Sequence, residues 1–173
     1  MLLNPLPPSV EPVRIRPITT RDAPALIAAH QASRGLHTPW VAPPLDRARF
    51  TAWLAPVKHG RKVALLAECA GVLVGVVNLN EIVRGGLQSA YLGYYGLAGH
   101  IGRGLMTRAV RLALDHAFGP LALHRVEANI QPGNVASRAL VQRLGFTLEG
   151  FSPRYLLIEG AWRDHERWAK LAD

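Results

Sequence analysis

The sequence predicts a single α+β domain, built on a mixed, mostly antiparallel sheet with helices on its flanks. Two observations lead to this fold class. Stretches with strand-like alternation and stretches with helical spacing follow one another in an irregular order, unlike the regular repeat of a βαβ protein. The length of 173 residues also suits one domain with a substantial hydrophobic core.

The first half of the chain is expected to hold a tail, a strand, two helices and a meander. Residues 1–12 contain four prolines and are predicted to form a flexible tail ahead of a domain spanning 13–173. Thr19 to Asp22 resembles a capping box that begins an alanine-rich helix, and Asp46 is placed to cap a second helix. The segment 35–44 is expected to be an irregular loop. Strands are predicted at residues 13–18, 62–69, 72–83 and 88–97.

The second half alternates helices and strands. Leu105, Ala109, Leu112 and His116 recur at helical spacing after a glycine-rich loop. Beyond this helix the pattern predicts a strand at 124–130, a helix at 134–144 stopped by a glycine, and two late strands at 146–150 and 155–158.

Composition narrows the class of protein. The formal net charge is +8, but the basic residues are scattered along the chain. We therefore interpret the charge as a bias in amino-acid composition and expect no direct, sequence-specific binding to nucleic acid. Electrostatic attraction to a ribosome is the alternative.

No apolar run is long enough to span a membrane and the start does not resemble a signal peptide, so a cytoplasmic location without membrane binding is expected. The single Cys69 excludes an internal disulfide, and the seven histidines show no metal-binding spacing, so no metal is expected. A monomer or a homodimer is compatible with this composition.

The most specific local signal is the glycine-rich stretch from Gly99 to Thr107. It follows a predicted strand and begins a helix, where free backbone amides and the helix dipole favour an anion such as a pyrophosphate. Its spacing matches neither the Walker P-loop nor the dinucleotide fingerprint. A loop whose glycines serve only a tight turn is equally compatible with this motif alone.

A wider set of short motifs surrounds this loop in a defined order. They are Pro39-Trp40, Arg84-Gly85, Tyr91 to Tyr94, His124-Arg125, Ala128-Asn129, Pro132, Asn134, Ser137, Leu140, Arg143 to Phe146, Glu149-Gly150, Tyr155 to Ile158 and Trp162 to His165. In this order and spacing the chain resembles the GNAT superfamily of acetyl-CoA-dependent N-acetyltransferases, most closely its ribosomal-protein alanine N-acetyltransferases. The resemblance covers residues 12–168.

The resemblance implies a fold with splayed central strands and a site for acetyl-CoA. Pyrophosphate is then expected on the backbone amides of Gly102, Arg103, Gly104, Met106 and Thr107. The strand edge from Tyr95 to Ala98 would bind pantetheine, a backbone amide near Leu97 or Ala98 would hold the oxyanion, and Asn134 would contact the cofactor from the other side. Val141 stands where the superfamily often has a tyrosine acid, so Ser137 is the expected proton donor. Trp40, Tyr95 and Tyr155 are the expected substrate-binding residues. For Trp40, filling its own loop is an equal alternative.

The base that removes the proton from the amine is sought among the few central carboxylates. Glu81 shares strand parity with Leu79 and is expected to point to a covered face, and Glu127 shares a face with Asn129. For each of them a solvated strand position is at least as plausible, and Glu81 ranks slightly ahead. Asp164-His165 has the form of a dyad, but a structural hydrogen bond is the simpler interpretation.

The leading hypothesis is therefore an enzyme that acetylates a protein N-terminus, that of a ribosomal protein in particular, by direct attack in a ternary complex. Acetylation of a small amine such as an antibiotic or toxin is the first alternative, and a negatively lined, closed pocket would favour it. The second alternative is a non-catalytic acyl-CoA sensor or ribosome-associated module, which the presence of Ser137, Glu81 and Glu127 disfavours.

Overall fold

The structure is a computed structural model that describes residues 12–172. Seven strands form one sheet in the order β1-β2-β3-β4-β5-β7-β6. Neighbouring strands are antiparallel except for β4 and β5, which are parallel. The α+β class with a mixed, mostly antiparallel sheet is therefore confirmed. Apart from Pro12, the expected tail lies outside the described residues.

The elements follow the predicted order closely. They are β1 (Val13–Pro17), η1 (Thr20–Asp22), α1 (Ala23–Ala32), α2 (Arg34–His37), α3 (Arg47–Leu54), η2 (Ala55–His59), β2 (Val63–Cys69), β3 (Val72–Val83), β4 (Ser89–Gly96), α4 (Leu105–Phe118), β5 (Arg125–Ile130), α5 (Val135–Arg143), β6 (Thr147–Ile158) and β7 (Ala161–Leu171). The predicted order contained neither the 3-10 helix η2 nor the strand β7, and two further details differ. The supposed loop after α1 begins with the short helix α2, and the two late strands are one strand, β6, whose register shifts between Ser152 and Leu156 around Arg154 at a positive φ of 48°. None of the helices in the described range is long and apolar enough to cross a membrane.

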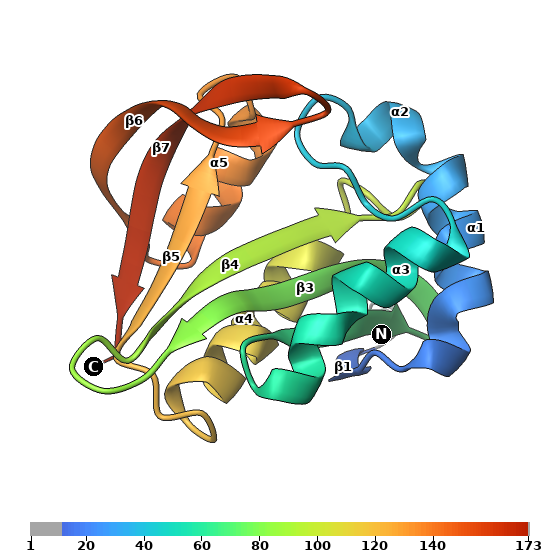
Figure 1. The fold of residues 1–173 in the computed structure, drawn as a ribbon, viewed down its shortest axis with the longest axis horizontal. Helices are drawn as coiled ribbons and strands as arrows, with labels where there is room; N and C mark the ends of the chain where they lie inside the picture. The colour runs from blue at the N-terminus through green and yellow to red at the C-terminus, as the bar shows by residue number, and fades with distance from the viewer. Residues whose placement is uncertain (1–11, 173) are drawn as a thin grey trace, which may run out of the picture.

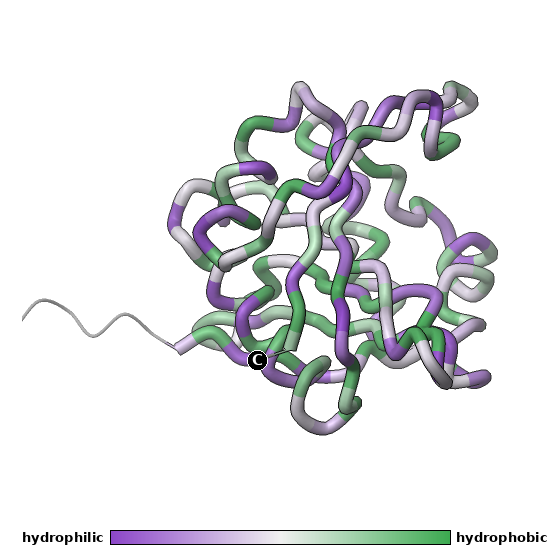
Figure 2. Tube along the Cα trace, turned by 90° about the vertical axis from the view of Figure 1, so that its left-hand side faces the viewer, coloured by the Kyte–Doolittle hydropathy of each residue, from purple (hydrophilic) through white to green (hydrophobic). Residues whose placement is uncertain are grey.

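Helices cover both faces of the sheet, and each face carries its own core. Adjacent residues of β3 point to opposite faces and belong to different cores. Val77 packs with Val110 of α4 and Val141 of α5, whereas Val76 packs with Leu26 of α1. We call these sides the α4 face and the α1 face. Short hydrophobic and hydrophilic stretches accordingly alternate along the tube in Figure 2. The strand alternation thus determines which side chains reach which helices.

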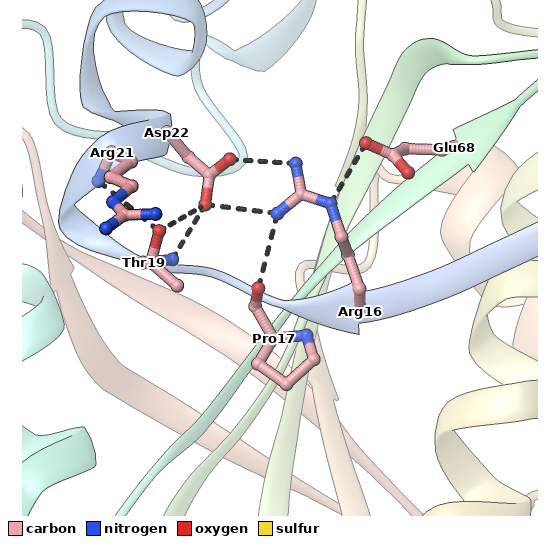
Figure 3. Close-up of polar contacts among 6 residues, drawn as sticks. All are labelled: Arg16, Pro17, Thr19, Arg21, Asp22 and Glu68. Carbon is pink, nitrogen blue, oxygen red and sulfur yellow. Dashed lines mark hydrogen bonds and ion pairs between the residues drawn. The ribbon is translucent and has the colours of Figure 1, made fainter.

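An ionic cluster links the start of the chain to the sheet. The guanidinium of Arg16 on β1 donates to both carboxylate oxygens of Asp22, at 2.8 and 3.1 Å, and to Glu68 on β2 at 3.1 Å (Figure 3). Asp22 also accepts from the amide of Thr19, which completes the predicted capping box. The arginine lowers the pKa of the Asp22 carboxyl below its usual range. The cluster therefore attaches the first helical turn to the edge of the sheet.

The sheet divides between its two parallel strands. β4 and β5 pair only from Ser89 to Tyr91, opposite Arg125 to Glu127, and then separate. Figure 1 shows the two strands side by side at one end and pointing in different directions at the other. The expected splay of the central strands is confirmed, and it opens the middle of the sheet to a ligand.

Candidate active site

A cavity of about 1260 Å³ lies where β4 and β5 separate. Its wall is built from the end of α2 with the following loop, β3, β4, the glycine loop, α4, β5, α5, and the β6–β7 hairpin. The hairpin and α2 approach each other above this opening in Figure 1. Segments from Leu36 to His165 therefore meet at one place.

The glycine loop closes one end of the cavity. Gly99, Gly102 and Gly104 have φ values of 82°, 74° and 71°, a left-handed conformation that glycine adopts without strain. Gly104 is the N-cap of α4 and has no side chain to satisfy the first amides of the helix. These amides, from Leu105 to Thr107, precede the intrahelical bond from the Arg108 amide to the Gly104 carbonyl. Amides of this kind suit a phosphate group.

Most of the predicted cofactor residues lie on the cavity wall. Gly102, Gly104, Met106, Thr107 and Asn134 line it, whereas Arg103, Leu97 and Ala98 are not among the lining residues. The wall also carries three arginines that were not predicted, namely Arg108, Arg111 and Arg143. Arg108 and Arg111 are three residues apart on α4, and this spacing was the available signal because it places them on one side of a helix. They bring positive charge to the end of the cavity that would hold phosphates.

The expected oxyanion donors do not fit the observed hydrogen bonds. The amide of Leu97 donates to the carbonyl of Val74 at 3.0 Å, and the amide of Ala98 donates to the Oγ of Ser33 at 2.9 Å. The amides of Leu97 and Ala98 themselves are therefore occupied, and the expected oxyanion donor near them stays a prediction. Because amides alternate in direction along an antiparallel strand, those of Tyr94 and Gly96 face the opening toward β5 instead.

Ser137 lies in the first turn of α5 with an unpredicted partner. The Oδ1 of Asn134 accepts from the Ser137 amide at 3.1 Å and so caps the helix. The Tyr94 hydroxyl of β4 lies 2.5 Å from the Ser137 Oγ and 3.2 Å from the Ser137 carbonyl oxygen. Burial raises the pKa of Tyr94 to about 12, so this phenol stays protonated at neutral pH. All three side chains belong to residues that line the cavity.

Glu81 does not point to a covered face, so this expectation is wrong. The residue has a positive φ of 45° and lies where the β3–β4 register shifts between Asn80 and Val83. Because of this irregularity, its side chain does not follow the alternation that would place it on the same face as Leu79. Its side chain is 55% exposed and forms an ion pair with Arg61, at the rim of the cavity.

Glu127 is half-buried on β5 and is also held by an arginine. Its carboxylate accepts from the Nε of Arg125 at 2.6 Å, and the same guanidinium binds Glu149. Glu127 is not among the residues that line the cavity. The assignment of either carboxylate as the base remains a prediction, and each is already engaged with an arginine.

The predicted substrate residues have three different surroundings. Trp40 lines the cavity and its ring lies against Gly133 in the β5–α5 turn. The side-chain amide of Gln131 donates to the carbonyl of the neighbouring Pro39 at 2.9 Å.

Tyr155 lines the cavity and receives a hydrogen bond from Tyr91, which raises the pKa of Tyr91 to about 12.

The third of these residues, Tyr95, also borders the cavity, but its hydroxyl lies on the α1 face, 3.2 Å from the Nε2 of His30, in the second core. The Nδ1 of His30 donates to the carbonyl of Pro44, so its Nε2 accepts the Tyr95 proton. The Tyr95 hydroxyl is therefore used in a hydrogen bond within the protein and is not available to bind a substrate.

Two buried histidines that were not predicted as site residues also line the cavity. His37 donates from Nε2 to the carbonyl of Gly96 at 2.8 Å, and its Nδ1 is buried without a partner. His165 on β7 donates from Nδ1 to the carbonyl of Arg163 at 2.9 Å. Burial lowers the pKa of both imidazoles, so both are neutral at pH 7.

The sequence matches the acetyltransferase (GNAT) domain family over residues 13–147. It is 45% identical over 94 residues to the probable N-acetyltransferase YjcK of Bacillus subtilis, covering 54% of this chain and 52% of that protein. It is 42% identical over 93 residues to the ribosomal protein uS5-alanine N-acetyltransferase of Escherichia coli, covering 54% of this chain and 48% of that protein. The chain thus spans about half the length of these relatives.

A solved structure is similar over more of the chain. RimJ from Mycobacterium smegmatis, in complex with CoA-disulfide, superposes with a TM-score of 0.85 at 33% identity, covering 92% of this chain and 82% of that chain.

Proposed function

Because the chain belongs to the GNAT acetyltransferase family, we propose that it transfers the acetyl group of acetyl-CoA to the N-terminal amine of a protein, with a ribosomal protein as the expected substrate. One observation carries this proposal. A single cavity runs between the splayed strands from the glycine loop and α4 to Ser137 on α5. It therefore joins a phosphate-binding end to a proton donor.

The chain offers a fitting set of groups for acetyl-CoA. The amides at the start of α4, together with Arg108, Arg111 and Arg143, would hold its phosphates. The open edge of β4 offers backbone groups to pantetheine, because no strand within residues 12–172 pairs with this edge beyond Tyr91. Acetyl-CoA supplies a thioester, whose carbonyl carbon is attacked and whose sulfur leaves as a thiolate.

Ser137 and Tyr94 serve the leaving group. In the transfer, the amine nitrogen bonds to the carbonyl carbon, the carbon–sulfur bond breaks, and the sulfur must gain a proton. The Tyr94 hydroxyl donates to the Ser137 carbonyl at 3.2 Å and lies 2.5 Å from the Ser137 Oγ, where either oxygen can be the donor. Ser137 lines the cavity and would pass its hydroxyl proton to the thiolate, with Tyr94 as its hydrogen-bond partner. The amides of Tyr94 and Gly96 face the same opening and would stabilise the oxyanion.

The charges on the cavity wall favour a peptide over a small polycationic amine. Among the described residues the wall carries two carboxylates, Glu81 and Glu159, and Glu81 is already paired with Arg61. A small cation would need a negatively charged, enclosed site to replace its hydration. A peptide with one terminal amine needs less negative charge and can use the polar groups of the wall for its backbone.

The test is acetyl-CoA turnover against a panel of N-terminal peptides, including ribosomal-protein termini, and small amines. We expect product on the α-amine of peptides, and lower kcat/KM for every small amine. A higher kcat/KM for a small amine than for any peptide would show that the acceptor is a small amine and not a protein N-terminus. Binding of acetyl-CoA without turnover of any amine would instead support a non-catalytic module.

A further inference from the structure

The mechanism above leaves the proton on the attacking amine without an acceptor. An α-amine has a pKa of roughly 7.7–8.0, so part of it is protonated at neutral pH, and it loses a proton as it attacks the thioester. Glu81 and Glu127 are both held by arginines, and Glu127 does not line the cavity. An acceptor is therefore expected elsewhere on the wall.

The acceptor is expected on the α1 face. Ser137 and Tyr94 meet on the α4 face, because Ser137 belongs to α5 and the Tyr94 ring packs against the core of that face. An amine that attacks the carbonyl carbon from the other side approaches from the α1 face. The two proton transfers then take place on opposite sides of the sheet.

His165 lies on this second side. On β7, Trp168 packs in the core of the α4 face and Glu166 pairs with Arg138 of α5, so His165 points the other way by strand alternation. No register shift interrupts the β5–β7 pairing from Arg125 to Ile130. By the same alternation, β5 presents Asn129, Glu127 and Arg125 on this face, and the carboxylate of Glu127 is paired with Arg125. β7 itself adds Arg163 and Arg167 two residues to either side of His165, and on β6 the ring centroid of Tyr155 is 6.1 Å from that of His165.

The tautomer of His165 leaves one nitrogen available. A carbonyl oxygen can only accept, so the Nδ1 of His165 carries the hydrogen that is donated to Arg163. In the neutral ring the Nε2 then has a lone pair. The adjacent carboxylate of Asp164 is turned away from the imidazole, and its Oδ1 accepts from the Arg154 amide at 2.7 Å. Asp164 and His165 therefore form no dyad, and a backbone carbonyl orients the imidazole.

His37, the other buried histidine of the wall, does not offer the same group. Its Nε2 donates to Gly96, and the remaining Nδ1 is fully enclosed without a partner. An enclosed atom cannot receive a proton from an amine in the cavity. His37 instead holds the end of β4 in position.

We propose that the Nε2 of His165 is the general base, taking the proton from the attacking amine directly or through one water molecule. The nitrogen–carbon bond forms as the N–H bond breaks and the proton passes to Nε2. The imidazolium then returns this proton to solvent after the products leave. This inference rests on the proposed acetyl transfer.

The test compares His165→Gln with a matched control, His124→Gln. His124 is exposed directly before β5, and its backbone carbonyl accepts from the Ala172 amide, a contact that the substitution keeps. Turnover of the best peptide is measured from pH 5 to 9, with calorimetric acetyl-CoA binding and melting temperature for each protein. We expect His165→Gln to bind acetyl-CoA like the parent and to lose about 100-fold in kcat. It should keep the decline in rate that protonation of the α-amine causes and lose the further decline that protonation of His165 adds at lower pH, because burial lowers the pKa of this imidazole. The control should match the parent.

A second variant separates a base from a merely structural side chain. His165→Ala opens space beside Tyr155, and added imidazole should restore part of its turnover, whereas lost packing cannot be restored in this way. A parent that turns over peptide, together with a His165→Gln variant of equal rate and equal pH profile, would overturn this inference alone. A parent that binds acetyl-CoA but acetylates no amine would overturn the proposed function itself.

Discussion

The Tyr94 hydroxyl lies 2.5 Å from the Oγ of Ser137, joining the open edge of β4 to the first turn of α5 across the splay of the sheet. Burial keeps the phenol protonated, and Ser137 is itself held by the Asn134 cap. The contact with Tyr94 therefore orients the serine hydroxyl, and the Asn134 cap holds the backbone that carries it.

Removal of this phenol should slow the chemical step. We expect Tyr94→Phe to lower kcat by about 3- to 10-fold, the value of one hydrogen bond, while the KM for acetyl-CoA changes little. Tyr95→Phe is the matched control, because it removes a buried hydroxyl that bonds His30 on the other face. Steady-state kinetics and melting temperatures of both variants provide the comparison. Equal kcat losses in the two variants would mean that Tyr94 only contributes to stability.

Ser137→Ala should act on the transition state more than on binding. Protonation of the leaving thiolate matters while the carbon–sulfur bond breaks, so kcat should fall by more than the KM for acetyl-CoA rises. A double variant with Tyr94→Phe should be hardly slower than Ser137→Ala, because Tyr94 acts through the serine. A change confined to KM would make Ser137 a binding residue, with water as the proton donor.

Gly104→Val should abolish acetyl-CoA binding. Gly104 has a φ of 71°, which a β-branched residue adopts only with strain, and its Cβ would stand beside the amides that begin α4. Gly60→Val is a matched control: its φ is 66°, a Cβ there also meets nothing within 4 Å, and it lies outside the cavity. Both variants should lose similar stability, and only Gly104→Val should lose affinity in calorimetry. Unchanged affinity in a folded Gly104→Val protein would show that the phosphates bind elsewhere.

Features that depend on neighbouring residues could be predicted from the sequence. The glycines before Leu105 indicated the start of α4, and Asp46 indicated the start of α3, because caps and left-handed turns are local. The contact between Tyr94 and Ser137 could not be predicted, since it joins residues 43 positions apart and depends on how α5 packs on the sheet.

The error at Glu81 has a local cause that the sequence does not reveal. Strand parity predicts a covered side chain only while the strand is regular, and a bulge at a non-glycine residue carries no reliable signal. His165 was missed for a related reason. Its neighbour Asp164 suggested a dyad, whereas the structure turns the aspartate outward and the imidazole into the cavity.

Neutralising the two carboxylates tests the earlier assignment of the base against His165. If His165 is the base, Glu81→Gln should change kcat by less than about 3-fold, because it breaks only an exposed ion pair with Arg61. Glu127→Gln should also have a small effect, since Glu127 lies outside the cavity wall. The measurement is the pH–rate profile of each variant. A loss of about 10-fold or more in Glu81→Gln, together with a flattened acidic limb, would restore Glu81 as the base.

The most direct test of the account as a whole is calorimetric titration of the protein with acetyl-CoA in the presence of a metal chelator, with ATP titrated in parallel. The cavity between β4 and β5 combines the amides of α4, three arginines and an open strand edge, which together suit the phosphates and the pantetheine arm of CoA. We predict saturable binding of acetyl-CoA and of CoA, with no comparable binding of ATP. Binding of ATP without binding of CoA would contradict the account.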